Sequence, residues 1–298
     1  MFMLGLILGL GTAVSQSFAY LFGRIIAQRG WPMLRLLILS HVIMGLIALP
    51  LTLLFWNDQF LAWRVWFWPL MGASVFYILG QTSFLTALRF TQPSRVAPLL
   101  GLKIVILASI AAVWLNLPLN TLQWIAVILA TIAAFLLNYT GGANPPRTVI
   151  AVLAACLFYA LSDTSIVFLI RAMQAGDSHL LASVRAVTLS YLFYGLIALP
   201  GAIRMKPAWR DWRSAMPYSL AWLGSMACLF GAISIINVVL TNILQSLRGL
   251  VSIALGVLVA RAGHHHLESH TPRAVLVRRV IAAAMMTAAV GLYVWPTA

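Results

Sequence analysis

The stretch "GLIALP" stands at residues 45–50 and again at residues 195–200. The match extends upstream, because residues 35–50 and 185–200 share nine identities, which include an arginine and the proline. Charged residues are scarce in this apolar chain, so coincidence explains such a match poorly. The repeated stretch therefore predicts an internal duplication, with two related halves in one chain.

The composition places the chain in a membrane. Of its 298 residues, 62% are hydrophobic and only 8% are charged, and the mean hydropathy is +0.98. Soluble domains carry roughly a quarter charged residues. This chain cannot cover a water-facing surface, so we predict an all-α, multi-pass membrane protein. The first apolar stretch follows no basic segment, which favours a permanent helix over a cleaved signal.

Ten apolar runs are long enough to cross a bilayer, since a spanning helix needs about 20 mostly apolar residues. Segments rich in Pro and Gly separate the runs, and several tryptophans lie near their ends, as expected at the headgroup level. The predicted spans are residues 2–27, 33–55, 62–88, 94–114, 121–139, 148–172, 179–203, 214–235, 238–260 and 274–295.

The duplication divides these spans into two sets of five. After the second span the offset between the halves falls from 150 to 145 residues, so Lys103 lies opposite Arg248. We predict one five-helix repeat at residues 1–139, a linker at 140–147 and a second five-helix repeat at 148–298.

The basic residues predict that the two halves are inverted. Because five is odd, the second copy must begin on the opposite side of the membrane. Fourteen of the nineteen Lys and Arg residues flank the loops after spans 1, 3, 5, 7 and 9, which share one side. The positive-inside rule makes that side cytoplasmic and both termini periplasmic, in a bacterial-type inner membrane. This placement at span ends also argues against nucleic-acid binding, despite the net charge of +14.

Two longer stretches carry a family resemblance: "FLTALRFTQPSRVAPLLGLKIVILASIAAVWLNLPLNTLQWIAVILATIAAFLLNY" (84–139) and "LFGAISIINVVLTNILQSLRGLVSIALGVLVAR" (229–261). In the first, an Ala-rich helix end leads through a short basic turn into a helix with Pro98 near its start. This pattern resembles the latter part of the EamA repeat of the drug/metabolite transporter superfamily. The resemblance implies a ten-helix carrier fold and says little about the substrate. The second stretch departs from the pattern, because Ile243 stands opposite Pro98.

Lys103 and Arg248 lie near the middle of their predicted spans. An ionisable side chain at that depth costs a few kcal/mol or more. Equivalent positions in inverted repeats share one depth near a pseudo-two-fold axis, where carriers of this kind place their substrates. We predict that both cations bind an anionic or carboxylate group. The alternative is a structural role, in which each snorkels or pairs with a carbonyl or with Asp163.

A polar stripe recurs at helical spacing along span 9, and a weaker one runs along span 3. Such a stripe lines a cavity or bonds helices to one another, and the pattern alone leaves both open. The predicted substrate-binding residues are Lys103, Arg248, Gln245, Thr241, Gln81 and Tyr77.

Asp163 is the only acidic residue well inside a predicted span. Tyr159 precedes it by one turn on the same helix face. If transport is proton-coupled, Asp163 is the side chain that would bind and release the proton. The alternative is a fixed counter-ion to Lys103 or Arg248.

No metal, cofactor or catalytic constellation is predicted. The two cysteines lie inside apolar runs and have no zinc-site spacing. A histidine-rich segment after span 9 lacks the fixed spacing that holds ligands, so we interpret it as a solvated loop, with weak metal contact or a pH-sensitive gate as alternatives. Its members are His264, His265, His266, Glu268 and His270.

Arg35 and Arg185 open their helices at equivalent positions of the two halves. We predict that they hold helix ends to headgroups or carbonyls, and a gating role is the alternative. His41, opposite Tyr191 in the repeat, is expected to be packed.

The chain is therefore predicted to be a secondary transporter, a permease or exporter that is not an enzyme. Its expected substrate is a small anionic or zwitterionic metabolite, such as an amino acid or organic acid, moved by alternating access between two inverted repeats. Its expected partners are that solute and the lipid bilayer, with the protein a monomer or a homodimer. The alternative is an integral-membrane enzyme or lipid-headgroup-handling protein, although the sequence has no phosphate loop, paired carboxylates or nucleophile–base arrangement.

Overall fold

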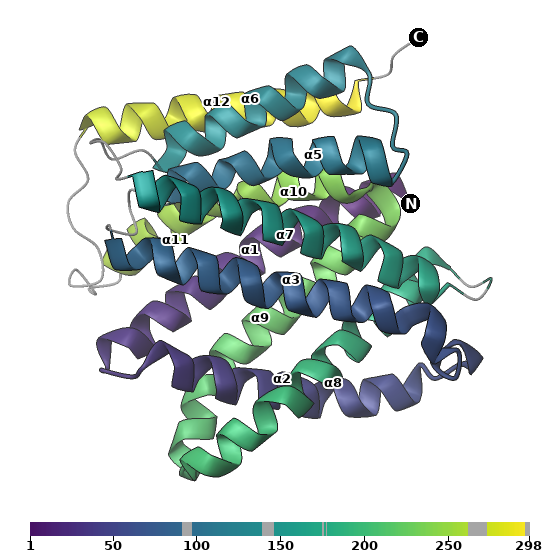
Figure 1. The fold of residues 1–298 in the computed structure, drawn as a ribbon. Coiled ribbons are helices and arrows are strands. Elements are labelled where there is room, and N and C mark those ends of the chain that lie inside the picture. The colour runs from purple at the N-terminus through teal and green to yellow at the C-terminus, as the bar shows by residue number, and fades with distance from the viewer. Residues whose placement is uncertain (91–96, 139–145, 175, 177, 262–272, 296–298) are drawn as a thin grey trace. The chain divides into compact units, whose positions relative to one another are not determined.

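The computed structural model describes residues 1–90, 97–138, 146–174, 176, 178–261 and 273–295 (Figure 1). Within these ranges the chain is built of helices and contains no strand. The α-helices are α1 (Phe2–Gln28), α2 (Met33–Leu54), α3 (Trp63–Phe90), α5 (Leu102–Trp114), α6 (Thr121–Asn138), α7 (Pro146–Ala172), α8 (His179–Met205), α9 (Trp209–Ile236), α10 (Val238–Ser246), α11 (Arg248–Arg261) and α12 (Arg273–Val294). Two short 3-10 helices are η1 (Asp58–Phe60) and η2 (Ala97–Gly101).

The ten predicted spans correspond to these helices, most of them within a few residues. Five helices, α1, α2, α7, α8 and α9, are long and apolar enough on their own to cross a membrane. Shorter apolar helices make up the spans formed by η2–α5, α6, α10–α11 and α12. The protein is therefore an all-α, multi-pass membrane protein, as predicted. Helix α9 begins at Trp209, five residues before the predicted start, because Asp211 caps its first turn.

Two spans that were predicted as continuous helices are divided. The fourth begins as η2, which contains Pro98, and becomes α-helical only at Leu102. The ninth is interrupted at Leu247, whose N–H bonds to the carbonyl of Leu244, three residues back, at 3.1 Å. These divisions fall at equivalent positions of the two repeats. Lys103 is consequently the second residue of α5, and Arg248 is the first residue of α11.

The helices form two compact units, and each contains segments from both halves of the chain. Unit 1 comprises residues 1–70 and 166–236, and unit 2 comprises residues 71–165 and 237–298. The predicted repeats, 1–139 and 148–298, divide the sequence and do not coincide with these two structural units. The predicted linker lies mostly outside the described residues, and α7 begins at Pro146.

In unit 1 the two copies of the repeated stretch contact each other, because α2 crosses α8 at Gly45 and Gly195. A Cβ placed on either glycine would lie 2.7 Å from the Cα of the other. The start of α2 contacts the end of α8, through Ile38 and Gly201. The two helices are thus antiparallel, as an inverted repeat requires. Helix α1 packs along α9 in the same unit.

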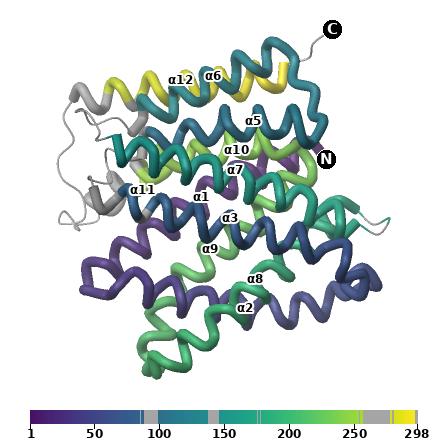
Figure 2. Tube along the Cα trace, in the orientation of Figure 1, coloured from purple at the N-terminus to yellow at the C-terminus, as the bar shows by residue number. Residues whose placement is uncertain are grey.

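In unit 2 helices α6 and α12 lie side by side (Figure 2), and α10 packs against α5. Helices α3 and α7 approach closely at two glycines. A Cβ on Gly72 would lie 2.7 Å from Ser165 Oγ, and one on Gly80 would lie 2.7 Å from the ring of Tyr159. Ser162 Oγ donates a hydrogen bond to the Ala73 carbonyl at 2.8 Å. These contacts fix the face of α7 that carries Asp163.

Candidate functional site

Lys103 and Asp163 form an ion pair inside unit 2. The Lys103 Nζ lies 2.6 Å from Asp163 Oδ2, and the two side chains are only 18% and 9% exposed. The short distance is typical of a charge-assisted contact between an ammonium and a carboxylate. Charge attraction is stronger here than in water, because apolar surroundings screen it little. The structure therefore shows Lys103 paired with Asp163, which was the alternative to a role in binding an anionic group.

Tyr159 connects this ion pair to helix α3. Its hydroxyl donates a hydrogen bond to Gln81 Oε1, and its ring lies 6.4 Å from the ring of Tyr77, centroid to centroid. The Lys103 Nζ lies 6.0 Å from the Tyr159 centroid, at the outer limit of a cation–π contact. The ring can sit here because Gly80 presents no side chain to it. Three helices, α3, α5 and α7, thus contribute to one polar group.

Of the predicted binding residues, Lys103, Tyr77 and Gln81 belong to this group, which also contains Asp163. We call Lys103, Asp163, Tyr159, Gln81 and Tyr77 the Lys103 cluster. Tyr159 was not among the predicted binding residues. The signal that could have identified it is its spacing of four residues from Asp163, which puts both side chains on one face of α7.

The remaining predicted residues lie on α10 and α11. Thr241 and Gln245 are buried in α10, and the Thr241 hydroxyl donates to the Asn237 carbonyl one turn back, at 2.6 Å. Within the described ranges, neither side chain forms a hydrogen bond with the Lys103 cluster. Leu247, between Thr241 and Arg248, keeps a right-handed helical backbone, so the predicted common face of these two residues stays a prediction. Arg248 is half-buried at the start of α11.

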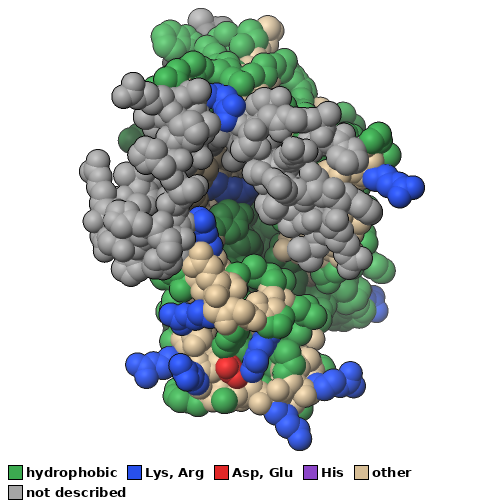
Figure 3. Space-filling view, turned by 90° about the vertical axis from the view of Figure 1, so that its left-hand side faces the viewer, with side chains coloured by type: hydrophobic (Ala, Val, Ile, Leu, Met, Phe, Trp, Pro, Cys, Tyr) green, Lys and Arg blue, Asp and Glu red, His purple; other side chains and the backbone are tan. Residues whose placement is uncertain are grey.

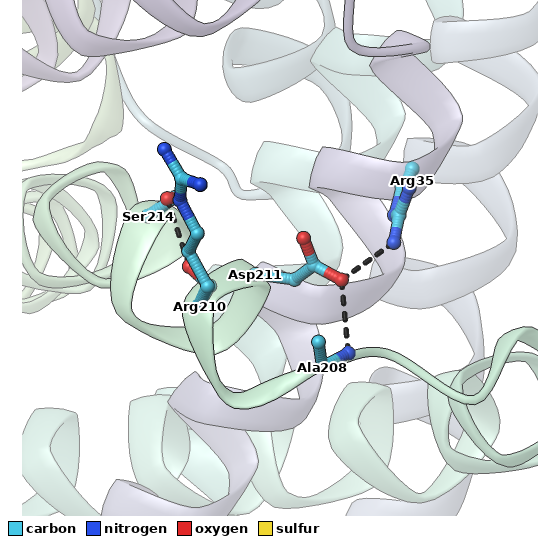
Figure 4. Close-up of polar contacts among 5 residues, drawn as sticks. All are labelled: Arg35, Ala208, Arg210, Asp211 and Ser214. Atoms are coloured by element: carbon cyan, nitrogen blue, oxygen red, sulfur yellow. Dashed lines mark hydrogen bonds and ion pairs between the residues drawn. The ribbon is translucent and has the colours of Figure 1, made fainter.

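A second ion pair joins Arg35 to Asp211 in unit 1 (Figure 4). Arg35 Nη2 donates to Asp211 Oδ2 at 2.6 Å, and the same oxygen accepts the Ala208 backbone N–H at 2.9 Å. Asp211 therefore caps α9 while it holds the start of α2. The Arg35 guanidinium also lies 4.9 Å from the centroid of the Trp31 ring. These contacts give Arg35 an anchoring role, although its main partner is a carboxylate and not the predicted headgroup or carbonyl.

Arg185 binds a carbonyl, as predicted. Its Nε donates to the Phe55 carbonyl at 3.0 Å, at the C-terminal end of α2. A cation is favourable there because the last carbonyls of a helix carry partial negative charge. Arg185 is 5% exposed. The equivalent Arg35 lies at the opposite end of α2, which again agrees with inverted repeats.

His41 is packed among aromatic rings, as predicted. Its ring stacks on Tyr191 at 6.4 Å between centroids. The Leu37 carbonyl oxygen, 2.7 Å from His41 Nδ1, accepts a hydrogen bond from that nitrogen. In the part of the chain that the structure describes, no three His, Cys, Asp or Glu side chains gather as a metal site would require. The histidine-rich segment at 264–270 lies outside that part.

Basic residues of two predicted loops lie on one side of unit 1. In Figure 3 hydrophobic side chains cover much of the surface that is not grey, and several Lys and Arg side chains lie toward its lower end. In unit 1 the contact between Arg35 and Asp211 brings the start of α2 next to the start of α9. The loops after spans 1 and 7 are therefore on the same side. Their exposed basic residues are Arg24, Arg29, Arg204, Lys206, Arg210 and Arg213.

Comparison with known proteins supports the fold and its family. The profile of the EamA-like transporter family matches residues 3–139, which is the first predicted repeat. A solved structure described as "Crystal structure of protein" aligns with a TM-score of 0.65 and 14% identity, over 95% of this chain and 96% of that chain. At that identity the likeness concerns the fold alone. The comparison with curated proteins gave no significant match. Residues 3–139 thus match the EamA-like transporter family, which agrees with the drug/metabolite transporter superfamily.

Proposed function

We propose that this membrane transporter carries a small anionic or zwitterionic metabolite and binds the acid group of its solute at Lys103. The observation that carries the proposal is the Lys103–Asp163 ion pair, set among apolar helices. Ionisable residues at membrane depth mark solute or ion pathways more often than structural contacts. Lys103 is one of two central cations, and only one acid faces it among the described residues.

The neighbours of Lys103 suit recognition of a polar solute. Gln81 has an amide and Tyr77 a phenol, which donate and accept hydrogen bonds. Both are half-buried. Arg248 supplies a second cation at the equivalent position of the other repeat, directly after an interrupted helix. Interruptions at corresponding positions of two repeats are typical of carrier binding sites, because half-helix N-termini favour anionic groups.

The proposed mechanism is alternating access between two inverted repeats. In unit 1 the antiparallel crossing of α2 and α8 supports the inverted relationship. A secondary carrier of this kind needs no soluble nucleotide-binding domain. The proposed location is a bacterial-type inner membrane, with the basic loops in the cytoplasm.

Counterflow in proteoliposomes tests the proposal. Vesicles loaded with unlabelled L-glutamate, L-alanine, succinate or citrate are diluted into the corresponding labelled solute, and exchange is followed. We expect exchange of at least one of these solutes, loss of it in Lys103→Met, and partial retention in Lys103→Arg. The matched control is Lys206→Met, since Lys206 is the only other lysine of the chain and is exposed.

Two results would contradict the proposal. One is the absence of exchange for all four solutes. The other is exchange that Lys103→Met and Lys206→Met affect equally. Turnover of a lipid headgroup by the same vesicles, without solute exchange, would instead support the membrane enzyme.

A further inference from the structure

We propose that each net-anionic solute is carried together with one proton, and that Asp163 is the group that binds this proton. The inference rests on the proposed function, because it assumes that the solute carboxylate binds Lys103. It adds the coupling ion and the order of events at that site.

The geometry makes Asp163 an internal competitor of the solute. Asp163 Oδ2 lies 2.6 Å from the Lys103 ammonium, where a solute carboxylate would have to bind. Both side chains are largely buried. An arriving carboxylate would therefore place two negative charges beside one positive charge in surroundings that screen them little. Two carboxylates that share such a site cannot both remain ionised, so one binds a proton.

The charge balance fixes the stoichiometry. At rest the site holds the Lys103 ammonium and the Asp163 carboxylate, with no net charge. When a solute carboxylate pairs with Lys103, a proton from the water phase binds Asp163 and makes it a neutral carboxylic acid. The loaded site is again neutral. When the solute leaves, the proton leaves with it and the original ion pair re-forms.

Asp163 is bound in a way that permits this exchange. Among the described residues, the Lys103 ammonium is the one partner of its Oδ2. The contrast is Asp211, whose Oδ2 accepts hydrogen bonds from both Arg35 and the Ala208 backbone. Neutralising Asp163 therefore breaks one ionic contact, whereas neutralising Asp211 would weaken an ion pair and a helix cap.

The groups around Asp163 leave it as the candidate proton carrier. Helix α5 contributes Lys103, and α3 contributes the uncharged Gln81 and Tyr77. On α7 itself the Tyr159 hydroxyl is committed to Gln81, and Cys156 Sγ lies 3.5 Å from the Leu99 carbonyl. Arg248 lies on α11 of the same unit, and arginine is a residue type that does not give up its charge in proteins. Asp163 is the only acid among the described residues of unit 2.

A zwitterionic solute offers a different outcome at the same site. Its carboxylate would pair with Lys103 and its ammonium with Asp163, so charge would balance without a proton. Net-anionic and zwitterionic probes therefore distinguish the two modes.

The experiment measures proton and solute movement together in proteoliposomes that contain a trapped pH-sensitive dye. The probes are labelled L-glutamate and succinate as net anions and L-alanine as a zwitterion. We expect each L-glutamate that enters to bring one proton into the lumen. When the external pH is lower than the internal pH, L-glutamate should accumulate inside by about ten-fold per pH unit of difference. L-glutamate transport should be electroneutral, and thus insensitive to a potassium diffusion potential.

The Asp163→Asn variant separates coupling from binding. It should still exchange L-glutamate in counterflow but should lose the proton signal and the pH-driven accumulation. Asp163→Glu should keep both. Asp211→Asn is the matched control, since it neutralises the other described acid that forms an ion pair, in this case with Arg35. The proton-to-solute ratio of this variant should equal that of the unmodified protein.

Each result supports or overturns the inference. Anion transport without proton movement, or a ratio unchanged in Asp163→Asn, would overturn it and leave the proposed function standing. Exchange of L-alanine alone, without proton movement, would also overturn the inference and leave the proposed function standing. No exchange of any probe would overturn both. If Asp163→Asn fails to fold, the proton-to-solute ratio and the electroneutrality of the unmodified protein still distinguish coupled from uncoupled transport.

Discussion

Gly45 and Gly195 meet backbone to backbone where α2 crosses α8. A Cβ on Gly45 would lie 2.7 Å from the Cα of Gly195 and 3.2 Å from the Tyr191 carbonyl oxygen. The reciprocal distances, from Gly195 to Gly45 and to the His41 carbonyl oxygen, are 2.7 and 3.1 Å. The two sets of distances are nearly equal, as expected when a local two-fold axis relates the two helices. The glycine of the repeated stretch thus allows the two copies to cross at close range.

Alanine at either glycine should destabilise the protein. Backbone atoms cannot move aside as a flexible side chain can, so the helices must separate, and we expect Gly45→Ala and Gly195→Ala each to lower stability by about 1–3 kcal/mol. Thermal unfolding of the purified protein checks this. The control is Gly291→Ala in α12, where nothing lies within 4 Å of the added Cβ. Equal melting temperatures for all three variants would contradict the crossing.

Removing one partner of the Lys103–Asp163 pair should cost more than removing both. Asp163→Leu alone leaves a buried ammonium without its counter-ion, so we expect a loss of about 3 kcal/mol or more, partly restored by Lys103→Met in the same chain. The two single variants and the double variant form a thermal-unfolding cycle. Strictly additive effects would show that the two side chains do not interact.

The Arg35–Asp211 pair should behave differently from the pair in unit 2. Arg35 is 35% exposed, and Asp211 retains the Ala208 N–H after the arginine is removed. We therefore expect Arg35→Met to cost at most about 1 kcal/mol. Asp211→Ala should cost more, because it removes the cap of α9 as well, and caps contribute about 1 kcal/mol. The same unfolding assay ranks the two variants, and the reverse order would contradict the capping role.

Tyr159→Phe tests the connection between Tyr159 and α3. The substitution keeps the ring packed on Gly80 but removes the donor to Gln81. Because a half-buried amide oxygen then loses its partner, we expect solute affinity to fall by about five-fold, or about 1 kcal/mol, with little change in maximal rate. Tyr20→Phe on α1, where the side chain is exposed, is the control. The solute dependence of counterflow gives both quantities, and an unchanged affinity would remove Tyr159 from the binding group.

The membrane orientation has its own measurement. The basic loops after spans 1, 3, 5, 7 and 9 predict that both termini face the periplasm. A reporter enzyme that functions only after export should be active when fused at either end. Activity of a reporter that works only in the cytoplasm would reverse the orientation, without changing the inverted relationship of the halves.

The sequence alone determined the number of spans and their approximate limits, and it predicted the duplication and the inverted arrangement. These features are encoded locally, because the length of an apolar run, the side on which its charges lie and a repeated stretch such as "GLIALP" require no knowledge of neighbours. The anchoring of Arg185 to a carbonyl and the packing of His41 were also predictable, since each follows from a residue's place along one helix.

Only the tertiary structure decided which residues meet. Span 9 was predicted as one helix with a polar face, and within it the Thr241 hydroxyl bonds to the Asn237 carbonyl one turn back, which the pattern alone did not indicate. Lys103 had two candidate roles, and its contact with Asp163 arises from the rotation of α5 and α7 about their own axes. That rotation is set by close packing at positions such as Gly80 and Ser162. A hydrophobic pattern that is apolar on every side of a helix carries almost no information about such rotation, and this is why the pairing could not be predicted from the sequence.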